Sequence, residues 1–107
     1  MNTLHNIQVA EEIKRQIGNR ALFMLGAHLF GYTSDVRSNS RGSLMFRIKG
    51  SKLCNHIEVS LNGKDLYDIT FTNIKHINVS KTFEVKNVIV EKLLDTITEH
   101  TELYTSV

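Results

Sequence analysis

"HIEVSLNGKDLYDITF", residues 56–71, contains two runs in which apolar and polar residues alternate, with Asn62-Gly63 between them. Alternation with a period of two is typical of strands that bury one face, and an Asn-Gly pair between two such runs indicates a hairpin. The stretch therefore predicts two antiparallel strands. Their inward side chains are expected to be Ile57, Val59, Tyr67, Ile69 and Phe71.

The turn determines whether the apolar faces of these two strands coincide. A two-residue loop at Asn62-Gly63, the usual first interpretation, leaves Tyr67 on the opposite face from Ile57. A three-residue loop over 61–63, with Gly63 left-handed in a bulge, pairs Ile57 with Tyr67. Because a one-residue slip moves every side chain to the other face, the shared apolar face favours the three-residue loop.

Two further runs with the same period flank this hairpin. "LMFRIK" (44–49) precedes it and "VSKTFEVK" (79–86) follows it, with Lys81 as a break in the second pattern that suits a sheet edge. The inward residues are expected to be Leu44, Phe46 and Ile48 in the first run, and Val79, Phe83 and Val85 in the second. The sequence thus predicts a four-stranded sheet.

Helical periodicity marks both ends of the chain. The predicted helices cover residues 6–17, 20–27 and 88–101. Gly18 is placed to end the first, Asn19 to cap the second and Asn87 to cap the third. Apolar residues surround most of the second helix, which predicts burial on more than one side. Gly26 and Gly31 bracket its exit.

The order of these elements predicts an α+β fold. Two N-terminal helices precede a four-stranded antiparallel meander, and a C-terminal helix packs on one sheet face. With 107 residues the chain is expected to form a single domain over 1–107, because two cores would each be too small to be stable. A flexible loop is expected at about 34–43 and a short tail at 102–107.

Composition restricts the compartment and the partners. A single cysteine, Cys54, excludes an internal disulfide and favours a reducing compartment such as the cytoplasm. No run approaches the roughly 18–20 apolar residues of a membrane span, and the first residues do not resemble a signal peptide. The net charge is +2, with +4 in residues 1–60 and −2 in residues 61–107, which predicts a dipolar molecule and an electrostatic docking surface.

The most basic stretch, residues 37–52, is the candidate contact surface. It holds five basic side chains and no acidic one. Such a run can neutralise phosphates of a nucleic acid, but strand alternation also explains its solvent-facing charges, and no interleaved aromatic residue offers a stacking platform. The candidate contacts to a protein or a nucleic acid are Arg37, Arg41, Arg47, Lys49 and Lys52.

Residue patterns for catalysis or metal binding are weak. Cys54 and His56 are two apart and can share a strand face, but no third group at a recognisable spacing would orient them. The five histidines are scattered singly, without the spacing of a zinc site. We therefore predict no catalytic residue, no cofactor and no metal. "TSV" at the end of the chain has the two-residue pattern of a terminal sheet-edge ligand, but packing of the tail through Leu103 and Tyr104 is the preferred interpretation.

Three segments carry a resemblance to a family. "QIGNRALFMLGA" (16–27), "VSLNGKDLYDITF" (59–71) and "VEKLLDTITEHTELYTSV" (90–107) together resemble small proteins encoded by bacteriophages and other mobile elements. The chain departs from that pattern where Ala21 follows Arg20 in place of an aromatic residue, and at Glu102, where glycine is common. The resemblance implies a phage origin and action in the cytoplasm of a bacterial host, and it brings no catalytic residues.

The expected function is non-enzymatic binding to a host or viral protein, which includes inhibition of a host defence. Self-association through an exposed strand is open, because a sheet of this kind has two edges. A nucleic-acid-binding module built on the basic stretch is the alternative, and an enzyme of unknown class is a more remote one.

Overall fold

A computed structural model of the protein describes residues 3–32, 40–50, 54–75 and 78–101. Five strands and three helices fall in these ranges. They are α1 (Thr3–Ile17), α2 (Asn19–Met24), β1 (His28–Tyr32), β2 (Ser40–Arg47), β3 (His56–Asn62), β4 (Tyr67–Lys75), β5 (Asn78–Val88) and α3 (Val90–Thr101).

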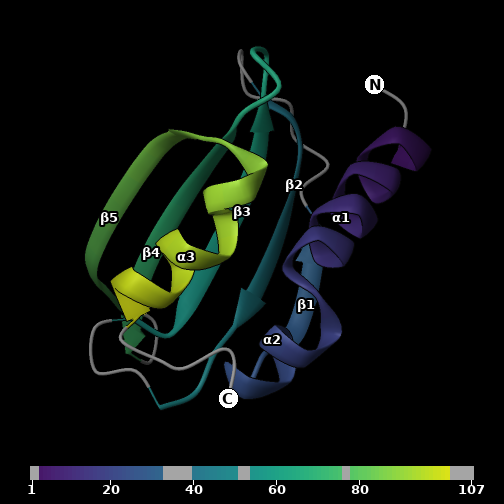
Figure 1. The fold of residues 1–107 in the computed structure, drawn as a ribbon. Coiled ribbons are helices and arrows are strands. Elements are labelled where there is room, and N and C mark those ends of the chain that lie inside the picture. Colours follow the sequence, from purple (N-terminus) through teal and green to yellow (C-terminus); the bar gives the residue numbers. More distant parts are fainter. Residues whose placement is uncertain (1–2, 33–39, 51–53, 76–77, 102–107) are drawn as a thin grey trace.

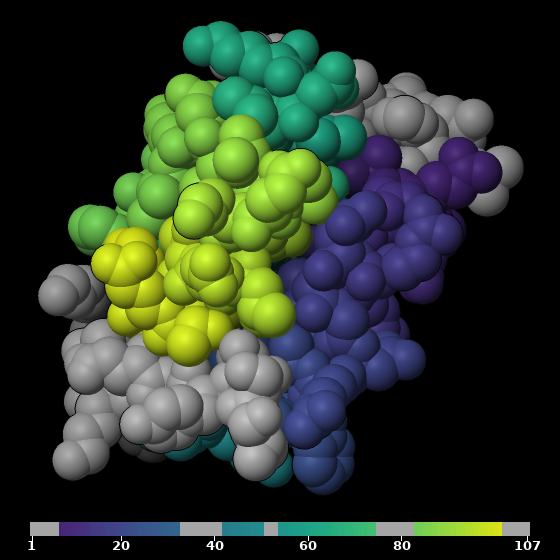
Figure 2. Space-filling model, in the orientation of Figure 1, coloured from purple at the N-terminus to yellow at the C-terminus, as the bar shows by residue number. Residues whose placement is uncertain are grey.

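The strands form one antiparallel sheet in the order β1-β2-β3-β4-β5, so each pairs with its neighbour in sequence. The helices lie on one face of this sheet (Figure 1). In the space-filling view of this face, α1 and α3 lie side by side over the strands (Figure 2). The predicted α+β class and the meander covered on one face are confirmed.

The core lies between this sheet face and the helices. α1 contributes Ile13 and Ile17, and α3 contributes Leu93 and Ile97. The strand residues that meet them are those of the predicted inward faces in β2, β3 and β4: Leu44, Phe46, Ile57, Val59, Tyr67, Ile69 and Phe71. A strand or helix that is buried on one face repeats its apolar residues with a period of 2 or 3.6. These periods in the sequence therefore identified most of the core residues.

A fifth strand, β1, corrects the prediction of four. Residues 28–32 were expected at the exit of the second helix, yet they pair with β2 through His28–Arg47, Gly31–Met45 and Tyr32–Leu44. The register shifts between His28 and Gly31, and Leu29 has a left-handed φ of 53°. Because this bulge interrupts the alternation of faces, "HLFGY" carries no period-two signal.

The hairpin between β3 and β4 has a different register from the one predicted. Ile57 pairs with Phe71, not with Tyr67, and the residue with positive φ is Asp65, not Gly63. The partner of Ile57 differs from the predicted one by an even number of residues, and an even shift keeps every side chain on the same face. The predicted shared apolar face is therefore confirmed, whereas the predicted turn is wrong. The longer loop is closed by Asn62, whose side-chain oxygen accepts hydrogen bonds from the backbone of Lys64 and Leu66 at 2.8 and 3.2 Å.

The starts of β2 and of the last helix also differ from the prediction. β2 begins at Ser40, so residues 40–43 of the predicted loop are strand, and its residues 34–39 lie outside the described ranges. The last helix begins at Val90, after Asn87, which has a left-handed φ of 58° within β5 and does not cap it. The tail at 102–107 lies outside the described residues.

Candidate functional site

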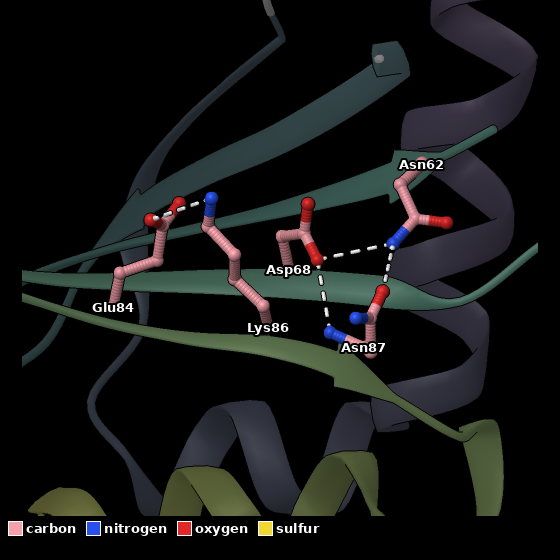
Figure 3. Close-up of polar contacts among 5 residues, drawn as sticks. All are labelled: Asn62, Asp68, Glu84, Lys86 and Asn87. Carbon is pink, nitrogen blue, oxygen red and sulfur yellow. Dashed lines mark hydrogen bonds and ion pairs between the residues drawn. The ribbon is translucent and has the colours of Figure 1, made fainter. Parts of the chain in front are cut away.

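The sheet face away from the helices carries charges of both signs. Arg47 lies opposite His56 across β2 and β3, and Met45 lies opposite Glu58. Further along the sheet, Glu84 and Lys86 on β5 form an ion pair at 3.7 Å (Figure 3). The described part of this face is therefore a mixed polar surface.

The five predicted basic contacts are brought together only in part. Arg47 is half-buried at the end of β2, and Lys49 is exposed beside the turn between α2 and β1, where its backbone N–H donates to Leu25 at 3.1 Å. The backbone of Arg41 lies in β2. Arg37 and Lys52 lie outside the described residues, so a single basic patch stays a prediction.

On the described part of this face, the environment of His56 shifts the pKa of its imidazole. Partial burial lowers the pKa of His56 below its usual value, Glu58 on the same strand raises it, and the positive charge of Arg47 lowers it. The net effect favours the neutral imidazole. Cys54, two residues earlier, is only 3% exposed and is part of the hydrophobic core.

A polar network fastens the end of the sheet where β3, β4 and β5 meet. The Asn62 side-chain amide donates to Asp68 at 3.1 Å and to Asn87 at 3.0 Å, and the Asn87 backbone N–H donates to Asp68 at 3.0 Å (Figure 3). Asn62 is 4% exposed, so these bonds satisfy a buried amide. The network therefore gives the Asp68 carboxylate a structural role.

The strongest departure from an ordinary surface lies in residues 23–32. Four large side chains in this segment are exposed: Phe23 by 86%, Leu29 by 72%, Phe30 by 41% and Tyr32 by 40%. We call these four residues the β1 surface. Phe23 corrects the prediction that the second helix is buried on more than one side, because α2 buries only the face with Ala21 and Leu22.

The side chains of β1 are held by the elements beneath them. The ring of Phe30 packs against Phe46 with the ring centroids 5.7 Å apart, and the Lys14 ammonium lies 4.3 Å from its centroid. Next to it is a hollow of about 170 Å³ between α1 and β1, lined in part by Ala10, Tyr32 and Leu44. Phe30 and Tyr32 therefore present a shaped, largely apolar surface at the edge of the sheet.

Strand β1 is also the end of the sheet. Among the strands that the structure describes, none pairs with its outer side. Such an edge presents unpaired N–H and C=O groups that another strand can join. Sequence reasoning missed this site because the bulge hides the strand. The available signal was the stretch 21–32, in which apolar and aromatic residues predominate over a length greater than one short helix can bury.

No protein-family model, curated protein or solved structure matches the chain. Within the described ranges, no group of three or more His, Cys, Asp or Glu side chains is arranged to hold a metal ion. The helices of the described chain include none that is long and apolar enough to cross a membrane.

Proposed function

We propose that this protein acts by non-enzymatic binding to another protein, and that the β1 surface is its docking site. The supporting observation is the exposure of four large apolar or aromatic side chains beside an open strand edge. An exposed apolar patch next to free backbone groups is typical of sites that bind a further strand. The resemblance to phage-encoded proteins adds a role as an accessory protein in the bacterial cytoplasm.

The two ends of the sheet differ in a way that supports this choice. β5, at the other end, contains Lys81, Glu84 and Lys86, and charge on an edge strand discourages pairing. β1 contains no Lys, Arg, Asp or Glu. Only the β1 end therefore combines an open edge with an uncharged strand.

The nucleic-acid alternative receives less support from the described surface. Phosphate binding depends on clustered positive charge. On the open sheet face, however, Glu58 and Glu84 lie among the basic side chains. The predicted basic residues stay as candidate contacts, with no further observation that favours this function.

The test places a photo-reactive phenylalanine analogue at position 29 of the full chain, expressed in bacterial cells. Illumination is expected to yield covalent adducts with protein, identified by mass spectrometry. The matched control carries the analogue at Ile89, which is 47% exposed near the other end of the sheet. Adducts from position 89 with none from position 29 or from position 23 would refute the β1 surface as the docking site.

A further inference from the structure

We propose that the occupant of the β1 surface is the β1 surface of a second copy. Two five-stranded sheets would then join edge to edge, antiparallel, around a two-fold axis. This inference rests on the proposed function, because it names the partner at the same site. It goes further by stating the symmetry and the stoichiometry of the complex.

The backbone of β1 provides the first argument. An unpaired edge is satisfied by any extended strand, and a strand placed antiparallel to its own copy automatically has two-fold symmetry. The bulge lies between His28 and Gly31, so Gly31 and Tyr32 are the regularly paired part of the strand, and Phe30 directly precedes them. A short self-pairing over these residues repeats the hydrogen-bonding pattern that already joins β1 to β2.

Side-chain chemistry provides the second argument. In a two-fold interface the same patch meets itself, so it must be self-complementary. The four side chains of the β1 surface are apolar or aromatic. The charges beside them are of both signs, with Lys14 over the Phe30 ring and Glu11 lining the same hollow, so two copies do not bring together charges of one sign only. Tyr32 adds a hydroxyl that can hydrogen-bond at the rim of the interface.

The exposed area suits a dimer. Taking roughly 200 Å² for a full aromatic side chain, the exposed parts of the four residues come to about 450 Å² per copy and about 900 Å² in the pair. Specific interfaces bury about 1,000 Å² or more in total. The paired backbone edges and the hollow between α1 and β1 supply the remainder.

The other end of the sheet favours a closed dimer over a fibre. Pairing β1 of one copy with β5 of the next would leave free edges and would propagate. That pairing sets an uncharged strand against one that contains Lys81, Glu84 and Lys86. The β1–β1 pairing avoids this mismatch and leaves only the charged edges exposed.

The first experiment is sedimentation equilibrium of the purified full chain over a range from about 1 to 200 μM. We expect a monomer–dimer equilibrium whose dissociation constant rises at least about tenfold in Leu29→Lys, because each dimer then holds two unpaired ammonium groups at the interface. Ile89→Lys, the matched control at the other end of the sheet, is expected to leave it unchanged. Circular dichroism confirms that each variant is folded, and Phe23→Lys replaces Leu29→Lys if the latter is not.

The second experiment tests the contact directly. Gly31→Cys lies next to the two-fold axis of the proposed pairing and has space for a side chain, so it is expected to form a disulfide-linked dimer under mild oxidation at low protein concentration, and Ile89→Cys is not. The native Cys54, at 3% exposure, is too buried to contribute. Because dimers can also form by random collision, the rate for Gly31→Cys is compared with that of the same variant in mild denaturant, where it should fall.

The outcomes separate the two proposals. A monomer at every concentration overturns the second-copy inference, and so does a dimer that Ile89→Lys weakens and Leu29→Lys does not, or an open-ended series of oligomers. If the chain is a monomer while position 29 still forms adducts with a different protein in cells, the docking site stands and its occupant is that protein. If neither position 29 nor position 23 forms adducts in cells, the docking proposal itself fails.

Discussion

At the scale of single residues, the pKa of His56 reflects the burial and the charges of the open sheet face. Its ring lies on β3 opposite Arg47, and Glu58 follows two residues later on the same side of the sheet. Partial burial lowers the pKa of His56, and the net effect of its neighbours does not reverse this shift. Protonation therefore costs more in the folded chain than in the unfolded chain.

This shift gives the stability of the protein a pH dependence. Between the lowered pKa of folded His56 and about 6.5, the usual histidine value, the unfolded chain binds more protons, so the free energy of unfolding falls as the pH falls. We expect His56→Gln to remove this part of the slope in urea unfolding measured from pH 5 to 8. Arg47→Gln is expected to reduce it, because one cause of the lowered pKa is lost. An identical slope in wild type and His56→Gln would contradict the assignment.

The packing of α1 on β2 depends on a close approach of two elements. Gly42 has a φ of 140°, and a Cβ built on it would lie 2.9 Å from the Cβ of Val9. Gly18, between α1 and α2, also has a positive φ, of 93°, but nothing lies within 4 Å of the corresponding position. An alanine at Gly18 therefore introduces backbone strain alone, whereas an alanine at Gly42 also introduces a steric clash with Val9.

Replacement of each glycine by alanine tests this difference. Gly18 has a φ of 93° and a ψ of 145°, a backbone conformation that is essentially restricted to glycine, so Gly18→Ala is expected to lower the free energy of unfolding by about 1–3 kcal/mol. Gly42→Ala adds an overpacking cost of about 1–3 kcal/mol, because α1 must shift away from β2. Urea unfolding measures both values. Equal losses of unfolding free energy in the two variants would contradict the close packing of α1 on β2 at Gly42.

The whole molecule depends on one core shared by helices from both ends of the chain. Ile13 on α1 and Ile97 on α3 are both 0% exposed, and both belong to the cluster that covers the sheet. A single core of this kind unfolds as one unit. The three helices are therefore expected to lose their structure together.

Ile13→Ala and Ile97→Ala are each expected to lower the free energy of unfolding by about 2–5 kcal/mol, through lost burial and a cavity. Val90→Ala is the control in α3, because its side chain is 39% exposed, and its cost should be much smaller. Far-ultraviolet circular dichroism and tyrosine fluorescence, the latter reporting in part on buried Tyr67, should give the same midpoint. Two separate transitions would show that the helices at the two ends belong to different units.

The sequence alone determined the class of the fold and the inward faces of β2, β3 and β4, because one-sided burial imposes a period on each strand. It also placed Gly18 correctly at the junction of α1 and α2. It did not reveal the register of the β3–β4 hairpin, which depends on hydrogen bonds from the buried Asn62 side chain. Two registers that differ by an even shift have the same pattern, so periodicity cannot distinguish them.

Only the tertiary structure decided where the candidate site lies. Period and charge pointed to the basic stretch at 37–52, whereas the exposed segment is 23–32. Phe23 and Phe30 have the composition of core residues, and the chain contains nothing local that tells a buried aromatic ring from an exposed one. Their exposure follows from position: Phe30 lies on β1, which ends the sheet, and Phe23 lies on α2 away from its buried residues Ala21 and Leu22. Burial is a property of what packs against a residue, and that is known only once the elements are assembled.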